Sequence, residues 1–130
     1  MNPILRNILA IIAGAVIGSI VNLLFVNIGP MVIAPPEGAD VTTMEGLAAT
    51  MHLFEPKHFI FPFLAHALGT LVGALIAAAI AANRKQTYAI VIGVFFLAGG
   101  TANVFMLPTP GWYIAVDLLF AYLPMGWLGY

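Results

Sequence analysis

The chain has 130 residues, of which 62% are hydrophobic and only 7% are charged, with a formal net charge of -1. Soluble domains carry about 25% charged residues, so this composition excludes a water-facing globule and a disordered tail. It also excludes a nucleic-acid binder, because no basic patch can neutralise phosphates. The absence of cysteine excludes disulfides and thiolate metal sites. The composition is that of an integral membrane protein.

Four apolar segments are each long enough to cross a bilayer, which takes about 20 residues of helix. They predict a single all-α transmembrane domain at 1–130, a four-helix bundle with spans at about 5–28, 59–83, 88–107 and 111–130. At the first span, Asn2 and Pro3 predict a helix start, and Gly29-Pro30 predicts its end. This apolar run exceeds the roughly 7–15 residues of a signal-peptide core, so we interpret it as a retained helix.

The few positive charges indicate a direction. Arg6 precedes the first span, and Arg84 and Lys85 lie between the second and third. These positions share one side of the membrane if all four segments cross, and positive residues favour the cytoplasmic side. We therefore expect both termini to be cytoplasmic.

The connection at 29–58, on the outer side, is long enough to hold structure. Thr42 and Glu45 have the spacing of a capping box, with Thr42 as the N-cap and Glu45 reaching back. Apolar residues then recur at helical spacing, at Met44, Leu47, Ala48, Met51 and Phe54. They predict a short amphipathic helix in the long outer loop. Such a helix either closes the top of the bundle, which apolar stripes favour, or docks a partner.

Stripes of small residues predict how the helices pack, because helices in lipid associate through close contact and polar pairs. The first span carries Gly14 and Gly18, and the second carries Gly69 and Gly73, each pair at four-residue spacing. We expect these two faces to meet. The alternative is a contact between two copies of the chain, since the same motif also joins separate helices.

Two further features constrain the second half of the chain. The connections at 83–87 and 108–110 are short, which makes the second, third and fourth helices antiparallel neighbours. Pro124 lies inside the last span, where it frees the carbonyl of Phe120 and should bend the helix.

Each predicted helix carries one polar residue at a similar depth. Asn22, His66, Asn103 and Asp117 lie roughly 6–10 Å below the outer interface at about 1.5 Å per residue. A carboxylate near the membrane centre costs on the order of 2–3 kcal/mol, so Asp117 must be protonated, paired or hydrated. These four residues form the candidate ligand- or ion-binding site. The alternative is polar glue, in which hydrogen bonds among them only hold the helices together.

Other chemistry has little support in the sequence. His52, Glu55 and His58 lie on the outer side, and imidazole with carboxylate suits zinc. Their spacing matches no compact ligand motif, so we predict no metal and no cofactor. The only serine, Ser19, has no base beside it in sequence, and no hydrolase or nucleotide motif occurs. We therefore predict no catalytic residue and no enzyme.

The chain is similar to a widespread family of small, uncharacterised bacterial four-helix inner-membrane proteins. Two stretches carry the resemblance, Ala-His-Ala-Leu-Gly-Thr-Leu-Val-Gly-Ala at 65–74 and Ala-Asn-Val-Phe-Met-Leu-Pro-Thr-Pro-Gly-Trp at 102–112. The resemblance covers nearly the whole chain. It implies a bacterial source, a multi-pass inner (cytoplasmic) membrane protein and this topology. It implies no activity, so no functional residue carries over.

Two functions remain in competition. The first is a small transporter or channel-like protein in which a small solute, cation or proton meets Asp117 and His66. A wide pore would then need a homo-oligomer, because four helices enclose little space. The second is a non-catalytic accessory or scaffold subunit with the lipid bilayer as its surroundings. An open path to the polar cluster favours the first function, whereas a dry, fully paired cluster favours the second.

Overall fold

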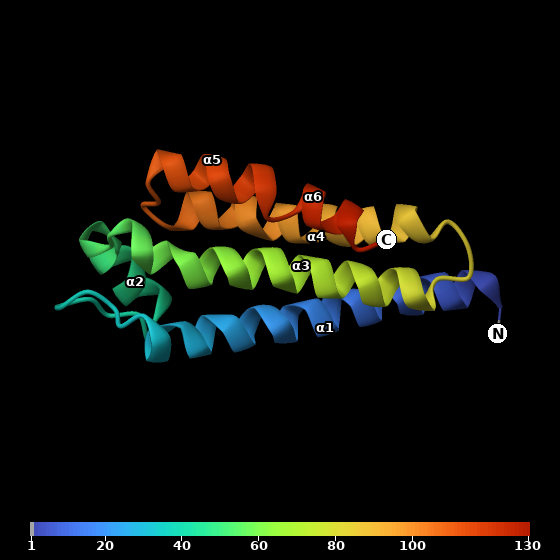
Figure 1. Ribbon diagram of the computed structural model, residues 1–130, viewed down its shortest axis with the longest axis horizontal. Coiled ribbons are helices and arrows are strands. Elements are labelled where there is room, and N and C mark those ends of the chain that lie inside the picture. Colours follow the sequence, from blue (N-terminus) through green and yellow to red (C-terminus); the bar gives the residue numbers. More distant parts are fainter. Residues whose placement is uncertain (1) are drawn as a thin grey trace.

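The computed structural model describes residues 2–130, and within that range it contains helices and no strands. In chain order the elements are α1 (Pro3–Val32), α2 (Met44–Thr50), η1 (Met51–Leu53), η2 (Pro56–Phe59), α3 (Ile60–Ile80), α4 (Lys85–Met106), α5 (Gly111–Phe120) and α6 (Leu123–Leu128). Figure 1 shows α1, α3 and α4 lying lengthwise, with α5 and α6 following one another along α4. The α2 segment lies at one end of the bundle, and the N-terminus and the α3–α4 turn lie at the other.

Four helical segments are long and apolar enough to cross a membrane: Pro3–Val32, Pro56–Ile80, Lys85–Met106 and Gly111–Leu128. Their outer faces expose large aliphatic side chains, including Ile12, Val16 and Ile20 of α1. An apolar surface of this extent would be unfavourable in water. The fold therefore confirms the predicted all-helical class and indicates a multi-pass membrane protein.

The predicted end of the first helix at Gly29-Pro30 is wrong, because α1 continues to Val32. Pro30 removes only its own N–H donor, and the Gly29 carbonyl still accepts a 2.8 Å bond from the Ile33 N–H. The chain becomes extended at Ile33, shortly before Pro35 and Pro36. Residues that precede prolines disfavour helix, which places the stop here rather than at the first proline.

The fourth span is interrupted rather than bent. α5 ends at Phe120, and α6 begins at Leu123 with Pro124 in its first turn. Proline has no N–H for the Phe120 carbonyl, so the helical ladder stops and restarts one turn later. The break turns Tyr122 inward, where its side chain is only 2% exposed.

Polar side chains close the end of α3 that lies far from α2. Lys85 Nζ donates to the carbonyls of Ala78 and Ala81, at 2.9 and 2.7 Å. Arg6 Nε donates to the Ile80 carbonyl. Asn7 Oδ1 accepts from the Ala82 N–H at 2.8 Å, although the sequence did not single out Asn7. The cations thereby stabilise the negative end of the helix dipole, and Arg6 and Lys85 lie at the same end of the bundle.

The glycine stripes of α1 and α3 lie face to face. A Cβ on Gly14 would come 2.6 Å from the Gly73 carbonyl oxygen, and one on Gly18 would come 2.7 Å from that of Gly69. No side chain larger than hydrogen fits at such a separation. Because the stripes are buried within one chain, they are not free to form the alternative contact between two copies.

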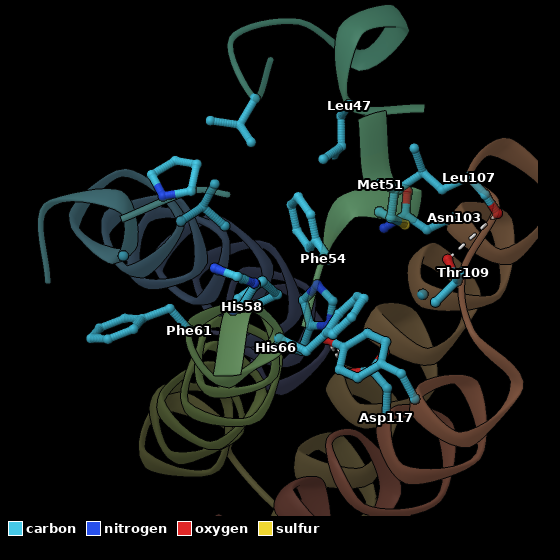
Figure 2. Close-up of a pocket in the computed structure, with 18 of the residues that line it drawn as sticks. Leu47, Met51, Phe54, His58, Phe61, His66, Asn103, Leu107, Thr109 and Asp117 are labelled. Carbon is cyan, nitrogen blue, oxygen red and sulfur yellow. Dashed lines mark hydrogen bonds and ion pairs between the residues drawn. The ribbon is translucent and has the colours of Figure 1, made fainter. Parts of the chain in front are cut away.

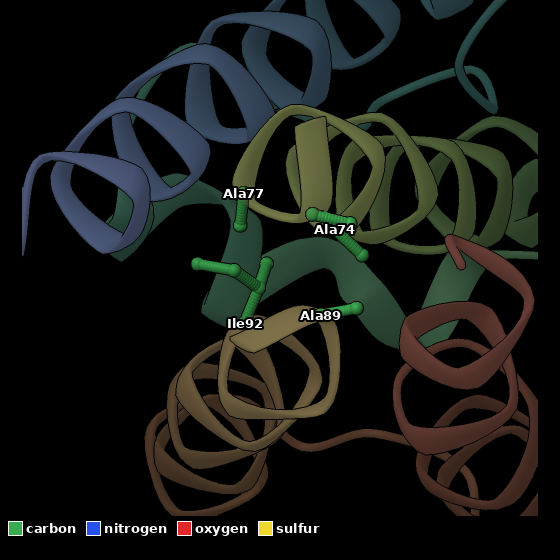
Figure 3. Packing of buried hydrophobic residues seen from close by; sticks show 5 residues of the cluster. Ala74, Ala77, Ala89 and Ile92 are labelled. Atoms are coloured by element: carbon green, nitrogen blue, oxygen red, sulfur yellow. The ribbon is translucent and has the colours of Figure 1, made fainter. Parts of the chain in front are cut away.

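Alanines extend this close contact to α4. The buried cluster consists of Ala74, Ala77, Ala78, Ala89 and Ile92. Figure 3 shows Ile92 of α4 facing Ala77 of α3. Its branched side chain also lies against the positions of Gly14 and Gly73, so it fills the space where the three helices meet.

The connection between α1 and α3 contains α2, with a start one residue later than predicted. Thr43, rather than Thr42, is the N-cap, and its Oγ1 accepts from the Gly46 N–H at 2.9 Å. Thr42 is unable to serve because its hydroxyl and N–H both donate to Asp40 Oδ1. The Thr42 hydroxyl, followed by its backbone N–H, holds the pKa of Asp40 below its usual value.

We expect Gly14→Ala to lower the free energy of unfolding by about 1–3 kcal/mol, because the methyl group must push α1 away from α3. The matched control is Gly99→Ala in α4, where an added Cβ meets nothing. That change should leave stability unchanged or slightly raised, because alanine favours helix. Thermal unfolding of both variants in one detergent measures the difference. Equal melting temperatures would contradict the close-contact interpretation.

Candidate functional site

The four polar residues predicted as a site line one cavity. Asn22 comes from α1, His66 from α3, Asn103 from α4 and Asp117 from α5. The cavity, of about 380 Å³, lies between these helices and the α2 segment. Most of its remaining lining is apolar. We call it the inter-helix cavity.

Asp117 is bonded directly to His66. The carboxylate is 5% exposed, and its Oδ1 lies 2.7 Å from His66 Nδ1. This bond joins α3 to α5 across the interior of the bundle. A buried carboxylate requires such partners, because leaving it unpaired in an apolar interior is costly.

Two tyrosines complete the surroundings of the carboxylate. Tyr122 donates its hydroxyl to Asp117 Oδ2 at 2.9 Å, and Tyr113 donates to Oδ1 at 3.4 Å. Neither tyrosine was predicted as a site residue from the sequence. Tyr113 precedes Asp117 by four residues, a helical spacing that could have identified it. Tyr122 follows by five and reaches the acid only because the chain breaks between α5 and α6. We call the side chains of Asp117, His66, Tyr113 and Tyr122 the Asp117 network.

Contacts with several residues hold His66 in position. It stacks on Tyr122, with ring centroids 5.7 Å apart and an interplanar angle of 27°. Thr70 Oγ1 donates to the His66 backbone carbonyl at 2.7 Å. Figure 2 shows the imidazole between Asp117 and Phe54, on the wall of the cavity. Among residues 2–130, Nδ1 is the only ring nitrogen of His66 with a hydrogen-bond partner, and Nε2 has none.

Asn22 and Asn103 lie in the same cavity but outside this network. Neither side chain forms a hydrogen bond with any residue in the described part of the chain. The backbone and Cβ of Asn22 lie against Gly69 at the helix contact. Of the four predicted residues, the geometry therefore joins His66 and Asp117 and leaves the two amides free.

An apolar cluster covers the end of the cavity near α2, and Tyr113 connects this cluster to Asp117. Met51, Phe59 and Tyr113 form a buried cluster, in which the ring centroids of Phe59 and Tyr113 lie 4.5 Å apart. Phe54 packs against this cluster, and Leu47 of α2 adjoins it. Figure 2 shows Leu47, Met51 and Phe54 on the side of the cavity away from Asp117. The Tyr113 side chain is 7% exposed and faces the interior.

The other titratable side chains near the cavity have local roles. His58 Nδ1 accepts from the Glu55 backbone N–H at 2.8 Å, at the start of η2. Lys57 lies 3.6 Å from the Glu55 carboxylate, and both are well exposed. Within residues 2–130 no group of three or more His, Cys, Asp or Glu could hold a metal ion.

No protein-family model, curated protein or solved structure matches the chain. The resemblance described from the sequence stays a prediction, and the site must be interpreted from its own geometry.

We expect Tyr122→Phe to lower the free energy of unfolding by about 1–3 kcal/mol, because Asp117 Oδ2 loses its donor inside the bundle. Tyr130→Phe removes the same hydroxyl from a side chain that is 66% exposed, so it should have no measurable effect. Chemical or thermal unfolding in detergent compares the two variants. A Tyr122→Phe protein as stable as the control would mean that the hydroxyl is not a significant partner of the acid.

Proposed function

We propose that the chain is a small-solute-binding membrane protein, transporter or channel-like, that takes its solute into the inter-helix cavity. One observation carries the proposal: the cavity reaches a histidine nitrogen and two amide side chains that have no partner within the described chain. Small-molecule sites are typically apolar spaces of about 300–1,000 Å³ with a few convergent polar groups. The size and lining of this cavity match that description.

A solute is better supported than a bare cation. The two Asp117 oxygens already accept from His66, Tyr113 and Tyr122. A cation on this carboxylate would have to displace those donors and find other oxygen ligands in an apolar space. Asn22 and Asn103 supply neutral amides, which are suited to hydrogen bonding a solute.

The proposed location is the inner (cytoplasmic) membrane of a bacterium, with both termini cytoplasmic. Arg6 and Lys85 lie at the end of the bundle away from α2, and positive residues favour the cytoplasmic side. In this orientation the cavity belongs to the outer half of the membrane, beneath the α2 segment. Solute from that side would reach His66 past α2 and Phe54.

The second candidate is an accessory or scaffold subunit, and the completeness of the Asp117 network favours it. Every fully buried side-chain nitrogen or oxygen in residues 2–130 has a hydrogen-bond partner. A network of this kind stabilises a bundle whether or not anything binds beside it. The two functions differ in whether the neighbouring cavity takes a ligand.

A ligand screen on a cavity-filling variant tests the proposal. Val104 lines the cavity from α4, so Val104→Phe should occupy part of the space. Val94→Phe adds the same ring to the same helix at a position that is 52% exposed. We expect some members of a panel of small alcohols, phenols, amides and inorganic cations to raise the melting temperature of the wild-type protein in nanodiscs. The same compounds should stabilise Val94→Phe and fail to stabilise Val104→Phe.

Two results would contradict the proposal. If no compound in the panel stabilises the wild-type protein, the cavity is not a binding site and the scaffold function is favoured. If the hits stabilise both variants equally, they act from the lipid or from another surface.

A further inference from the structure

The Asp117 network determines which atoms a ligand can meet. Asp117 is an acceptor, and both of its oxygens are used by donors of the same chain. The carboxylate therefore has little capacity left for a ligand and serves instead to orient His66. This inference rests on the proposed function, since it describes what the cavity would bind.

The bond to Asp117 also determines the hydrogen-bonding role of His66. The Tyr113 and Tyr122 hydroxyls also donate to the Asp117 side chain, which is the pattern of an ionised, accepting carboxylate. Such a carboxylate requires Nδ1 to carry the proton in the 2.7 Å contact with Oδ1. In the neutral imidazole the other nitrogen, Nε2, is then an acceptor. Nε2 has no hydrogen-bond partner in residues 2–130. Every fully buried side-chain nitrogen or oxygen in that range has one, so Nε2 is not fully buried. Nε2 is therefore accessible from the cavity that His66 lines.

The charge of the cavity restricts the ligand further. At its polar end the only charged group is Asp117, which is already covered by donors. An anionic ligand placed there would face the carboxylate with no counter-ion of its own, and burying an unpaired charge is strongly unfavourable. A cationic ligand could contact the carboxylate only by displacing His66 or a tyrosine. Lys57 also lines the cavity, but it is exposed and lies near Glu55. The greater part of the lining, including Phe54, Val104 and Leu118, is apolar.

We infer that the cavity takes an uncharged, mainly apolar molecule bearing a hydroxyl group, and that this hydroxyl donates a hydrogen bond to Nε2 of His66. The apolar body of the ligand lies against Phe54 and Val104. Asn22 and Asn103 supply further hydrogen bonds to any second polar group.

Three matched probes test the inference: para-propylphenol, its methyl ether and para-propylbenzoate. The ether keeps the shape and removes the donor, while the benzoate adds a charge. Binding is followed in nanodiscs by the ring-nitrogen NMR signals of protein labelled with 15N-histidine, at matched probe concentrations in the bilayer. Comparison with His66→Gln assigns the His66 signals, and the exposed His52 serves as an internal control.

We expect the phenol to shift the Nε2 signal of His66 and to bind roughly tenfold or more tightly than the ether, as one well-formed hydrogen bond allows. The benzoate should not bind. His52 should not respond to any probe, and Val104→Phe should abolish the response to the phenol.

The failures are distinguishable. Equal binding of phenol and ether, or preferred binding of the benzoate, would overturn the inference about ligand class while leaving cavity binding intact. Binding of the phenol without a shift at His66 would also overturn it. If these probes and the broader panel all fail to bind, the proposed function fails with the inference.

Discussion

A carboxylate inside an apolar bundle must be surrounded by donors, and this requirement explains the half of the structure that lies near α2. Asp117 is 5% exposed, and it receives donors from α3, from its own helix and from the break that follows. His66 of α3 bonds to it and thereby links the second and fourth spans. This bond fixes how the two spans face each other, which apolar packing alone does not do. The same bond leaves Nε2 of His66 facing the cavity. The bond that stabilises the bundle thus leaves one imidazole nitrogen without a partner in the described chain.

Small residues and the break between α5 and α6 shape the rest of the interior. Gly14, Gly18, Gly69 and Gly73 bring α1 and α3 into backbone contact along the middle of the bundle. Pro124 ends the regular ladder and allows Tyr122 to reach both Asp117 and the ring of His66. Gly100 accepts the ring of Tyr122, since a Cβ at that position would overlap it. Close packing at the centre and open space beneath α2 are therefore parts of one arrangement.

The sequence predicted the features that depend on periodicity and failed where local competition decides. Hydropathy predicted the four spans, and depth counting placed Asn22, His66, Asn103 and Asp117 at one level, where they line one cavity. The sequence could not show that Tyr122 reaches Asp117. Residues five apart lie on different faces of a continuous helix, and only the break between α5 and α6 brings these two together. The N-cap moved from Thr42 to Thr43 because Asp40 bonds Thr42. Which of two neighbouring residues caps a helix depends on side-chain contacts of this kind, and residue spacing alone does not reveal them.

We infer that Asp117 orients His66 so that Nε2 is an acceptor in the cavity. The most direct measurement is the ring-nitrogen NMR spectrum of ligand-free, 15N-histidine-labelled protein in nanodiscs at mildly alkaline pH. We expect His66 to carry its proton on Nδ1 and Nε2 to be unprotonated, the reverse of the tautomer that free imidazole side chains prefer. A proton on Nε2 of His66 would contradict the account, because the nitrogen facing the cavity would then be a donor.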